Sequence, residues 1–180
     1  SVEASYMITE EIGLIKVLKF GGNTFNEFIS AISKLKSMGC KSFIVDLRGN
    51  EGGYLEAALS MTNEFLSKGD LIVYTEGRSF PRTDSYATGT GTCKTNDLVV
   101  LIDEMSASSS EVFAGAIQDN DRGLVIGRRS FGKGLVQSQR MFDDGSAIRL
   151  TVGLYSEAMK RVKMLNMKLK QLIDFCKAIL

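Results

Sequence analysis

The chain has 180 residues, the size of one globular domain, and its 44% hydrophobic and 24% charged content exclude a disordered or fibrous protein. The formal net charge of +1 excludes the strongly basic surface of a typical nucleic-acid-binding protein, so we expect no nucleic-acid partner. The chain contains no histidine, which excludes Ser-His-Asp catalysis, Cys-His catalysis and the zinc sites that use histidine.

The first half of the chain is predicted to alternate between strands and helices. Residues 12–20 are β-rich and end at a Gly-Gly pair, after which Thr24 and Glu27 have the spacing of a capping box. We expect a helix from Thr24 to Gly39 and then a buried strand over residues 42–47. The glycine-rich loop 48–53 leads into a second predicted helix over residues 55–66.

The second half repeats this order. Residues 71–75 and 98–102 are predicted buried strands, and the polar segment 76–97 between them is expected to form an exposed hairpin or flap. A loop at 106–110, a helix over 111–118 and a strand over 124–127 follow, and then β-rich segments at 135–142 and 147–155. Such alternation predicts an α/β fold with a parallel sheet covered by helices.

Two loops are expected to meet at one edge of the predicted sheet. The loop 49–53 and the loop 106–110 each follow a strand and precede a helix. The carboxyl ends of parallel strands form one edge, and ligand sites gather outside that edge. We therefore look for functional residues in these two loops.

The C-terminal tail, residues 156–180, differs from the core, residues 1–155. The tail holds six Lys/Arg residues against two Asp/Glu residues, and its apolar residues repeat in an a/d heptad pattern. We expect a basic amphipathic helix that docks on another surface or forms a homo-oligomer. A helix lying on a membrane surface is the alternative.

Ser108 lies where the strand over 98–102 passes into the next predicted helix. Backbone N–H groups and the positive dipole end at a helix start can stabilise an oxyanion, which suits a nucleophilic hydroxyl. The alternative is structural, because Ser108 and Glu111 have the spacing of a capping box. Taken alone, the local sequence favours capping.

Lys133 lies between two glycines, which lets its side chain approach a neighbouring backbone without obstruction. A lysine acts as a base only after it loses its proton, and that requires a pocket of low dielectric. Gln137 follows four residues later, so in an extended segment it projects to the same side and can orient the lysine. The alternatives are a solvated loop lysine and an ordinary polar strand residue.

The segment from Gly127 to Lys133 also fits the first seven positions of a phosphate-binding P-loop. Gly134 replaces the Ser or Thr that ligates magnesium, and a strand is predicted where a P-loop has a helix, so we reject nucleotide binding. Three scattered cysteines offer no CxxC metal or redox site. Acyl transfer by a serine and a lysine needs no metal and no cofactor, so we expect neither.

Three segments in this order resemble the C-terminal processing peptidases, also called tail-specific proteases: FIVDLRGNEGG, LVVLIDEMSASSSEVFAGAIQDNDRGLVIG and RRSFGKGLVQ. The most specific feature is the Ser-Ala-Ser-x-Ser-Glu block, whose nucleophile position precedes the lysine of Phe-Gly-Lys-Gly by 25 residues. The resemblance runs from about Tyr6 to Tyr155. It implies a crotonase/ClpP-like core and endopeptidase activity near the C-termini of protein substrates.

The resemblance also implies roles for single residues. Ser108 corresponds to the nucleophile, Lys133 to the base and Gln137 to the residue that positions the lysine. The further positions that match expected oxyanion donors are Gly52, Gly53 and the amide of Ser109.

Other family features bear on this chain less directly. Asp119 corresponds to an acidic position of the family motif, although we assign it to local structure, and we expect Asp46 and Arg48 to form a structural pair. Ser109 stands where the family often has alanine.

The family usually carries a PDZ domain before this core, so we expect one in a full-length protein. The resemblance also implies a periplasmic or cell-envelope location. The alternative function is a non-catalytic module of the same fold that binds peptides or other ligands.

Overall fold

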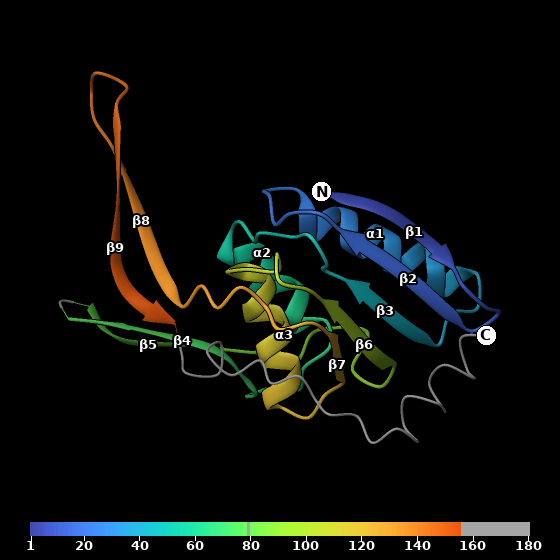
Figure 1. Ribbon diagram of the computed structural model, residues 1–180. Coiled ribbons are helices and arrows are strands. Elements are labelled where there is room, and N and C mark those ends of the chain that lie inside the picture. Colours follow the sequence, from blue (N-terminus) through green and yellow to red (C-terminus); the bar gives the residue numbers. More distant parts are fainter. Residues whose placement is uncertain (79, 156–180) are drawn as a thin grey trace.

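The computed structural model describes residues 1–78 and 80–155, which form two β-sheets and three helices (Figure 1). The first sheet has the strand order β1-β2-β3-β6-β7 and the second has the order β5-β4-β9-β8. The first comprises β1 (Val2–Met7), β2 (Ile12–Val17), β3 (Ser42–Asp46), β6 (Asp97–Ile102) and β7 (Leu124–Gly127). The second comprises β4 (Leu71–Gly77), β5 (Phe80–Tyr86), β8 (Leu135–Met141) and β9 (Ala147–Tyr155). The helices are α1 (Thr24–Ser37), α2 (Leu55–Asn63) and α3 (Ser109–Asp119).

The first sheet confirms the predicted α/β class. Strands β2, β3, β6 and β7 run parallel, so their carboxyl ends share one edge. Strand β1 pairs antiparallel with β2 at the outer edge of the sheet and is absent from the sequence prediction. The amphipathic helix predicted over residues 156–180 lies outside the described residues.

The three helices pack side by side, α1 against β1 and β2, and α3 against β7 and β4. The ring of Phe65 lies at the centre of the core and makes edge-to-face contacts with Phe28, Phe43 and Phe113 at centroid distances of 6.2, 6.4 and 6.1 Å. These contacts join α1, β3 and α3, so the loops at the sheet edge start from a rigid base. Within residues 1–78 and 80–155, no helix is long and apolar enough to cross a membrane.

The start of α1 corrects the predicted capping box. Asn23 is the N-cap residue, and its side chain makes no capping hydrogen bond. The Thr24 hydroxyl accepts a hydrogen bond from the Gly21 amide at 2.7 Å and donates to the Lys19 carbonyl at 3.1 Å. Glu27 binds the amino terminus of the chain instead of closing the box. The helix begins where expected, but long-range contacts and the preceding turn determine its start.

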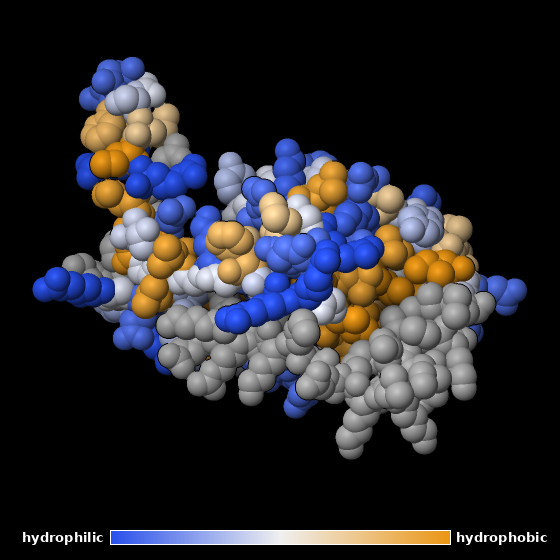
Figure 2. Space-filling model, in the orientation of Figure 1, coloured by the Kyte–Doolittle hydropathy of each residue, from blue (hydrophilic) through white to orange (hydrophobic). Residues whose placement is uncertain are grey.

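The second sheet is antiparallel and joins segments far apart in the sequence. β4 and β5 form a hairpin that includes part of the segment 76–97, and β4 also pairs with the end of β9 at Thr75 and Tyr155. β8 and β9 then continue away from the body as a two-stranded arm (Figure 1). Figure 2 shows hydrophobic residues on this arm, where Met141, Ile148 and Leu150 are exposed. The base of the arm forms one wall of the pocket that contains Ser108.

Candidate active site

Ser108 occupies a strained turn between β6 and α3. Its backbone angles are φ 55° and ψ −114°, and few non-glycine residues adopt a positive φ. Such a conformation persists only where surrounding contacts hold it. The loop is closed by the Asp103 amide, which donates to the Ser106 hydroxyl at 3.0 Å, and by the Ala107 amide, which donates to the Asn50 carbonyl at 3.1 Å. These contacts present Ser108 at the carboxyl edge of the first sheet.

The glycine-rich loop after β3 lies directly against the Ser108 turn, as the parallel order of β3 and β6 predicts. A Cβ atom on Gly52 would lie 2.8 Å from the Ser108 Cβ and 2.6 Å from the Ala107 carbonyl oxygen. A Cβ atom on Gly53 would overlap the carbonyl oxygen of Phe20. Both glycines also have positive φ values, +98° and +143°. The loop therefore needs glycine at position 52 to approach Ser108 and glycine at position 53 to approach Phe20.

Asn50 is a fully buried residue that the sequence analysis does not single out. Its side-chain amide donates to the Val17 carbonyl at 2.9 Å, and its Oδ1 accepts the Gly52 amide at 2.9 Å. Its carbonyl oxygen accepts hydrogen bonds from the Ala107 amide and, at 2.8 Å, from the Ser110 hydroxyl. Asn50 therefore ties the end of β2, the glycine loop and the Ser108 turn together. A polar residue inside a glycine-rich loop after a buried strand is the sequence signal for this role.

Two of the predicted oxyanion donors, the backbone amides of Ser109 and Gly53, belong to the two loops that meet at Ser108. Ser109 begins α3, and the first amides of a helix have no partner inside the helix. The Gly53 amide donates no hydrogen bond to another described residue, and the Gly53 carbonyl accepts the Ser109 hydroxyl at 2.9 Å. Gly52, also predicted as a donor, gives its amide hydrogen bond to Asn50 instead. Its observed role is to let the two loops approach each other.

Glu111 joins the Ser108 turn to the Lys133 loop. Its side chain is 1% exposed, and its carboxyl group accepts four hydrogen bonds. The Ser108 and Lys133 amides both donate to Oε2 at 2.9 Å. The Ser130 hydroxyl and the Gly132 amide donate to Oε1 at 2.7 and 2.6 Å. The sequence predicts Glu111 only as the second residue of a capping box with Ser108, and the hydrogen bond from the Ser108 amide confirms this prediction. The three hydrogen bonds from the Lys133 loop were not predicted.

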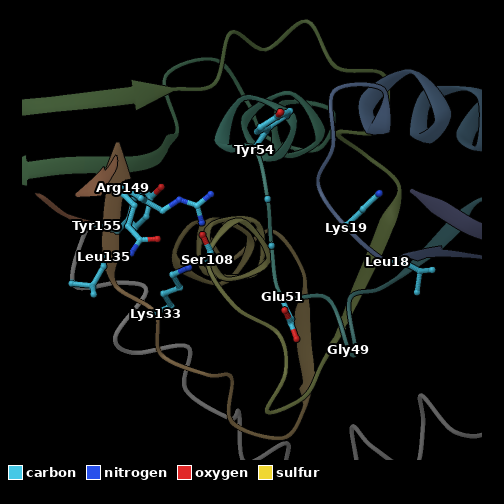
Figure 3. A pocket seen from close by; sticks show the side chains of 13 residues that line it. Leu18, Lys19, Gly49, Glu51, Tyr54, Ser108, Lys133, Leu135, Arg149 and Tyr155 are labelled. Atoms are coloured by element: carbon cyan, nitrogen blue, oxygen red, sulfur yellow. The ribbon is translucent and has the colours of Figure 1, made fainter. Parts of the chain in front are cut away.

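Ser108, Lys133 and Gln137 line one pocket of about 610 Å³, so the structure brings together the three side chains that the sequence singles out. Figure 3 shows the Lys133 amine pointing toward Ser108. Lys133 is half-buried, and Gln137 lies on β8 at the base of the arm. The other charged residues that line the pocket are Lys19, Glu51 and Arg149.

The predicted structural pair lies outside this pocket. Arg48 Nη2 lies 2.8 Å from Asp46 Oδ2, and Lys16 Nζ lies 3.3 Å from Asp46 Oδ1. Burial alone would raise the pKa of Asp46, but the Arg48 hydrogen bonds and the Lys16 charge outweigh it and hold the pKa below its usual value. Asp119 lies at the end of α3, where burial raises its pKa, and it is not among the residues that line the pocket.

The sequence matches the family model described as peptidase family S41 over residues 11–164. The chain belongs to peptidase family S41. Every residue that lines the Ser108 pocket lies inside the matched segment of the S41 model.

The names of relatives confirm the resemblance to the C-terminal processing peptidases. The chain is 38% identical over 147 residues to a carboxyl-terminal-processing protease of Synechocystis sp., and the aligned region covers 81% of this chain and 34% of the relative. It is 40% identical over 141 residues to a probable CtpA-like serine protease of Staphylococcus epidermidis, which covers 78% of this chain and 29% of the relative. The solved photosystem II D1 C-terminal processing protease superposes with a TM-score of 0.73 at 33% identity, over 81% of this chain and 37% of that one. The chain thus spans about a third of the length of these relatives.

Proposed function

We propose that this S41 chain is the catalytic core of a serine endopeptidase that cleaves protein substrates near their C-termini. The observation that carries the proposal is the convergence of Ser108 and Lys133 on one pocket, where Glu111 holds both backbones. The chain has no histidine, so a lysine is the base that the pocket offers. The names of the relatives, which refer to carboxyl-terminal processing and to serine proteases, support the substrate class and the reaction.

In the first half of the proposed reaction, Ser108 becomes acylated. The Lys133 amine takes the proton of the Ser108 hydroxyl while Oγ attacks the carbonyl carbon of the scissile peptide bond. The carbonyl oxygen gains the negative charge and accepts hydrogen bonds from the Gly53 and Ser109 amides. The Lys133 ammonium then gives its proton to the leaving amine, the C–N bond breaks, and an ester to Ser108 remains.

In the second half, water releases the acyl group. Lys133, again an amine, takes a proton from a water molecule as the water oxygen attacks the ester carbon. The same two amides hold the oxyanion, and Lys133 returns the proton to Oγ when the ester C–O bond breaks. Gln137 also lines this pocket. Its proposed role is to orient the lysine through a hydrogen bond. The products are a new carboxyl terminus and the free Ser108 hydroxyl.

The proposal is tested by the cleavage of an unstructured protein such as casein by the Ser108→Ala variant. The rate should fall by at least about a thousandfold, because the nucleophile is lost while the pocket remains. Circular dichroism checks that the variant keeps its fold. The matched control is Ser60→Ala on α2, outside the pocket, which should cleave at the wild-type rate.

Turnover near the wild-type rate in Ser108→Ala would reduce Ser108 to a helix cap. The chain would then fit the alternative, a non-catalytic module that binds peptides or other ligands. A PDZ domain in the full-length protein and a cell-envelope location stay predictions from the family resemblance. Oligomerisation through the tail stays a prediction from its heptad pattern.

A further inference from the structure

Arg149 brings a guanidinium group into the pocket that contains Ser108. Figure 3 shows its side chain extending from β9 toward Ser108. Gln137 of β8 pairs with Thr151 of β9, and Arg149 lies two residues from Thr151. Gln137 and Arg149 therefore project from the same face of the arm, the face that forms the pocket wall. The sequence analysis assigns no role to Arg149.

The pocket presents more positive than negative groups to a substrate. Its cationic or basic lining residues are Lys19, Lys133 and Arg149, and its acidic one is Glu51. Figure 3 shows the Glu51 side chain pointing away from Ser108. The buried carboxyl group of Glu111 is not among the groups that line the pocket, and it already accepts four hydrogen bonds. An anionic group that enters the pocket therefore meets more basic than acidic side chains among the residues that line it.

We propose that Arg149 is a specificity-determining residue that binds a carboxylate of the substrate beside the scissile bond. The inference rests on the proposed peptidase function and adds the substrate chemistry of the same site. A guanidinium carries five N–H donors in a planar fork that matches a carboxylate, so it can hold this group beside another partner. Two groups carry this chemistry: the α-carboxylate of a chain end and the side chain of Asp or Glu.

The test is a binding measurement on the Ser108→Ala variant, which keeps the pocket and cannot turn the peptide over. The probe is a short fluorescein-labelled peptide of alanine and leucine, prepared as a free acid, as a C-terminal amide and as an amide with one aspartate. Fluorescence anisotropy gives a dissociation constant for each. At least one carboxylate form should bind about tenfold more tightly than the plain amide, since a hydrogen-bonded charged group contributes that much.

The decisive variant adds Arg149→Gln to Ser108→Ala. The ratio of the carboxylate to the amide dissociation constants should then approach one. Arg149→Lys, which keeps the charge but loses the fork, should retain part of the preference. The matched control is Arg140→Gln, which removes the same charge from the same arm. Arg140 pairs with Ile148, so it lies on the face opposite to Arg149.

The two carboxylate sources are distinguished by which peptide shows the effect. If Arg149→Gln removes a preference for the free acid, Arg149 binds the α-carboxylate of a chain end. If it removes a preference for the aspartate peptide, Arg149 binds an acidic side chain. Equal binding of all three peptides, or a preference that survives Arg149→Gln, would overturn the inference. A preference that Arg140→Gln removes equally would also overturn it, because the effect would then belong to the general charge of the arm. Failure of the peptidase proposal appears separately, as a lack of cleavage by the wild type.

Discussion

At the scale of single residues, substitutions of Lys133 can distinguish a role as a general base from a role as a positive charge. Arginine keeps the charge and much of the length, but its guanidinium stays protonated at any working pH. Lys133→Arg should therefore lose as much peptidase activity as Lys133→Ala, by more than about a hundredfold. Initial rates of cleavage by the wild type and by both variants measure this effect.

The control for this change is Lys94→Arg, since Lys94 donates to the Gly89 carbonyl and does not line the pocket. It should cleave at the wild-type rate. The loss of a general base should lower the rate by much more than tenfold. If Lys133→Arg kept more than about a tenth of the wild-type rate, Lys133 would therefore act only by attracting or holding the substrate.

Glu111 is predicted to stabilise the fold and to position both Ser108 and Lys133. Glu111→Gln replaces one acceptor oxygen with an NH₂ group, which then faces hydrogen-bond donors such as the Ser108 and Lys133 amides. A buried donor left without an acceptor costs about 1–3 kcal/mol, so the free energy of unfolding should fall by about that amount. Peptidase activity should fall as well, because the two loops lose their common anchor. Urea unfolding and initial rates measure the two effects.

Glu104→Gln is the matched control for Glu111→Gln. Glu104 forms an exposed ion pair with Arg128 at 2.7 Å, and such pairs contribute at most about 1 kcal/mol. Wild-type activity and stability in Glu111→Gln would show that the four hydrogen bonds to this carboxyl group matter little.

At the scale of elements, the close approach of two loops determines whether Ser108 reaches its working position. Gly52→Ala would place a methyl group 2.6 Å from the Ala107 carbonyl and 2.8 Å from the Ser108 Cβ, so the loops must separate. Activity should fall by more than the loss of stability explains. Gly49→Ala is the control, because Gly49 also has a positive φ, +75°, but an added Cβ meets no atom within 4 Å. Equal losses in both variants would mean that backbone strain, not the contact with Ser108, is responsible.

Local sequence patterns predict where helices and strands lie better than they predict which distant segments or side chains these contact. The strands of the parallel sheet and the three helices follow from apolar periodicity and from glycine positions, and they appear where expected. The pairing of β4 with β9 joins Thr75 to Tyr155, and no local pattern reports a contact over that separation. The capping box at Thr24 fails for the same reason, because Glu27 has a better partner in the amino terminus.

At the scale of the whole molecule, the candidate site depends on contacts between five segments of the chain. These are the end of β2, the glycine-rich loop, the Ser108 turn, the Lys133 loop and the base of the β8–β9 arm. Ser108, Lys133 and Gln137 were predictable from a motif, and the structure places them on one pocket. Asn50 and Glu111 connect the segments, but each looks like an ordinary loop or cap residue in the sequence. Their importance lies in hydrogen bonds to partners up to 60 residues away, which only the folded chain reveals.

The central claim, that Lys133 activates Ser108, is tested most directly by a fluorophosphonate, which bonds covalently to an activated serine hydroxyl. Mass spectrometry gives the site and the rate of labelling in the wild type and in Lys133→Ala. The expected result is a single adduct on Ser108 that forms at least about a hundredfold more slowly in Lys133→Ala, as the loss of a general base requires. An adduct on another serine, or a rate that does not depend on Lys133, would contradict the proposed mechanism.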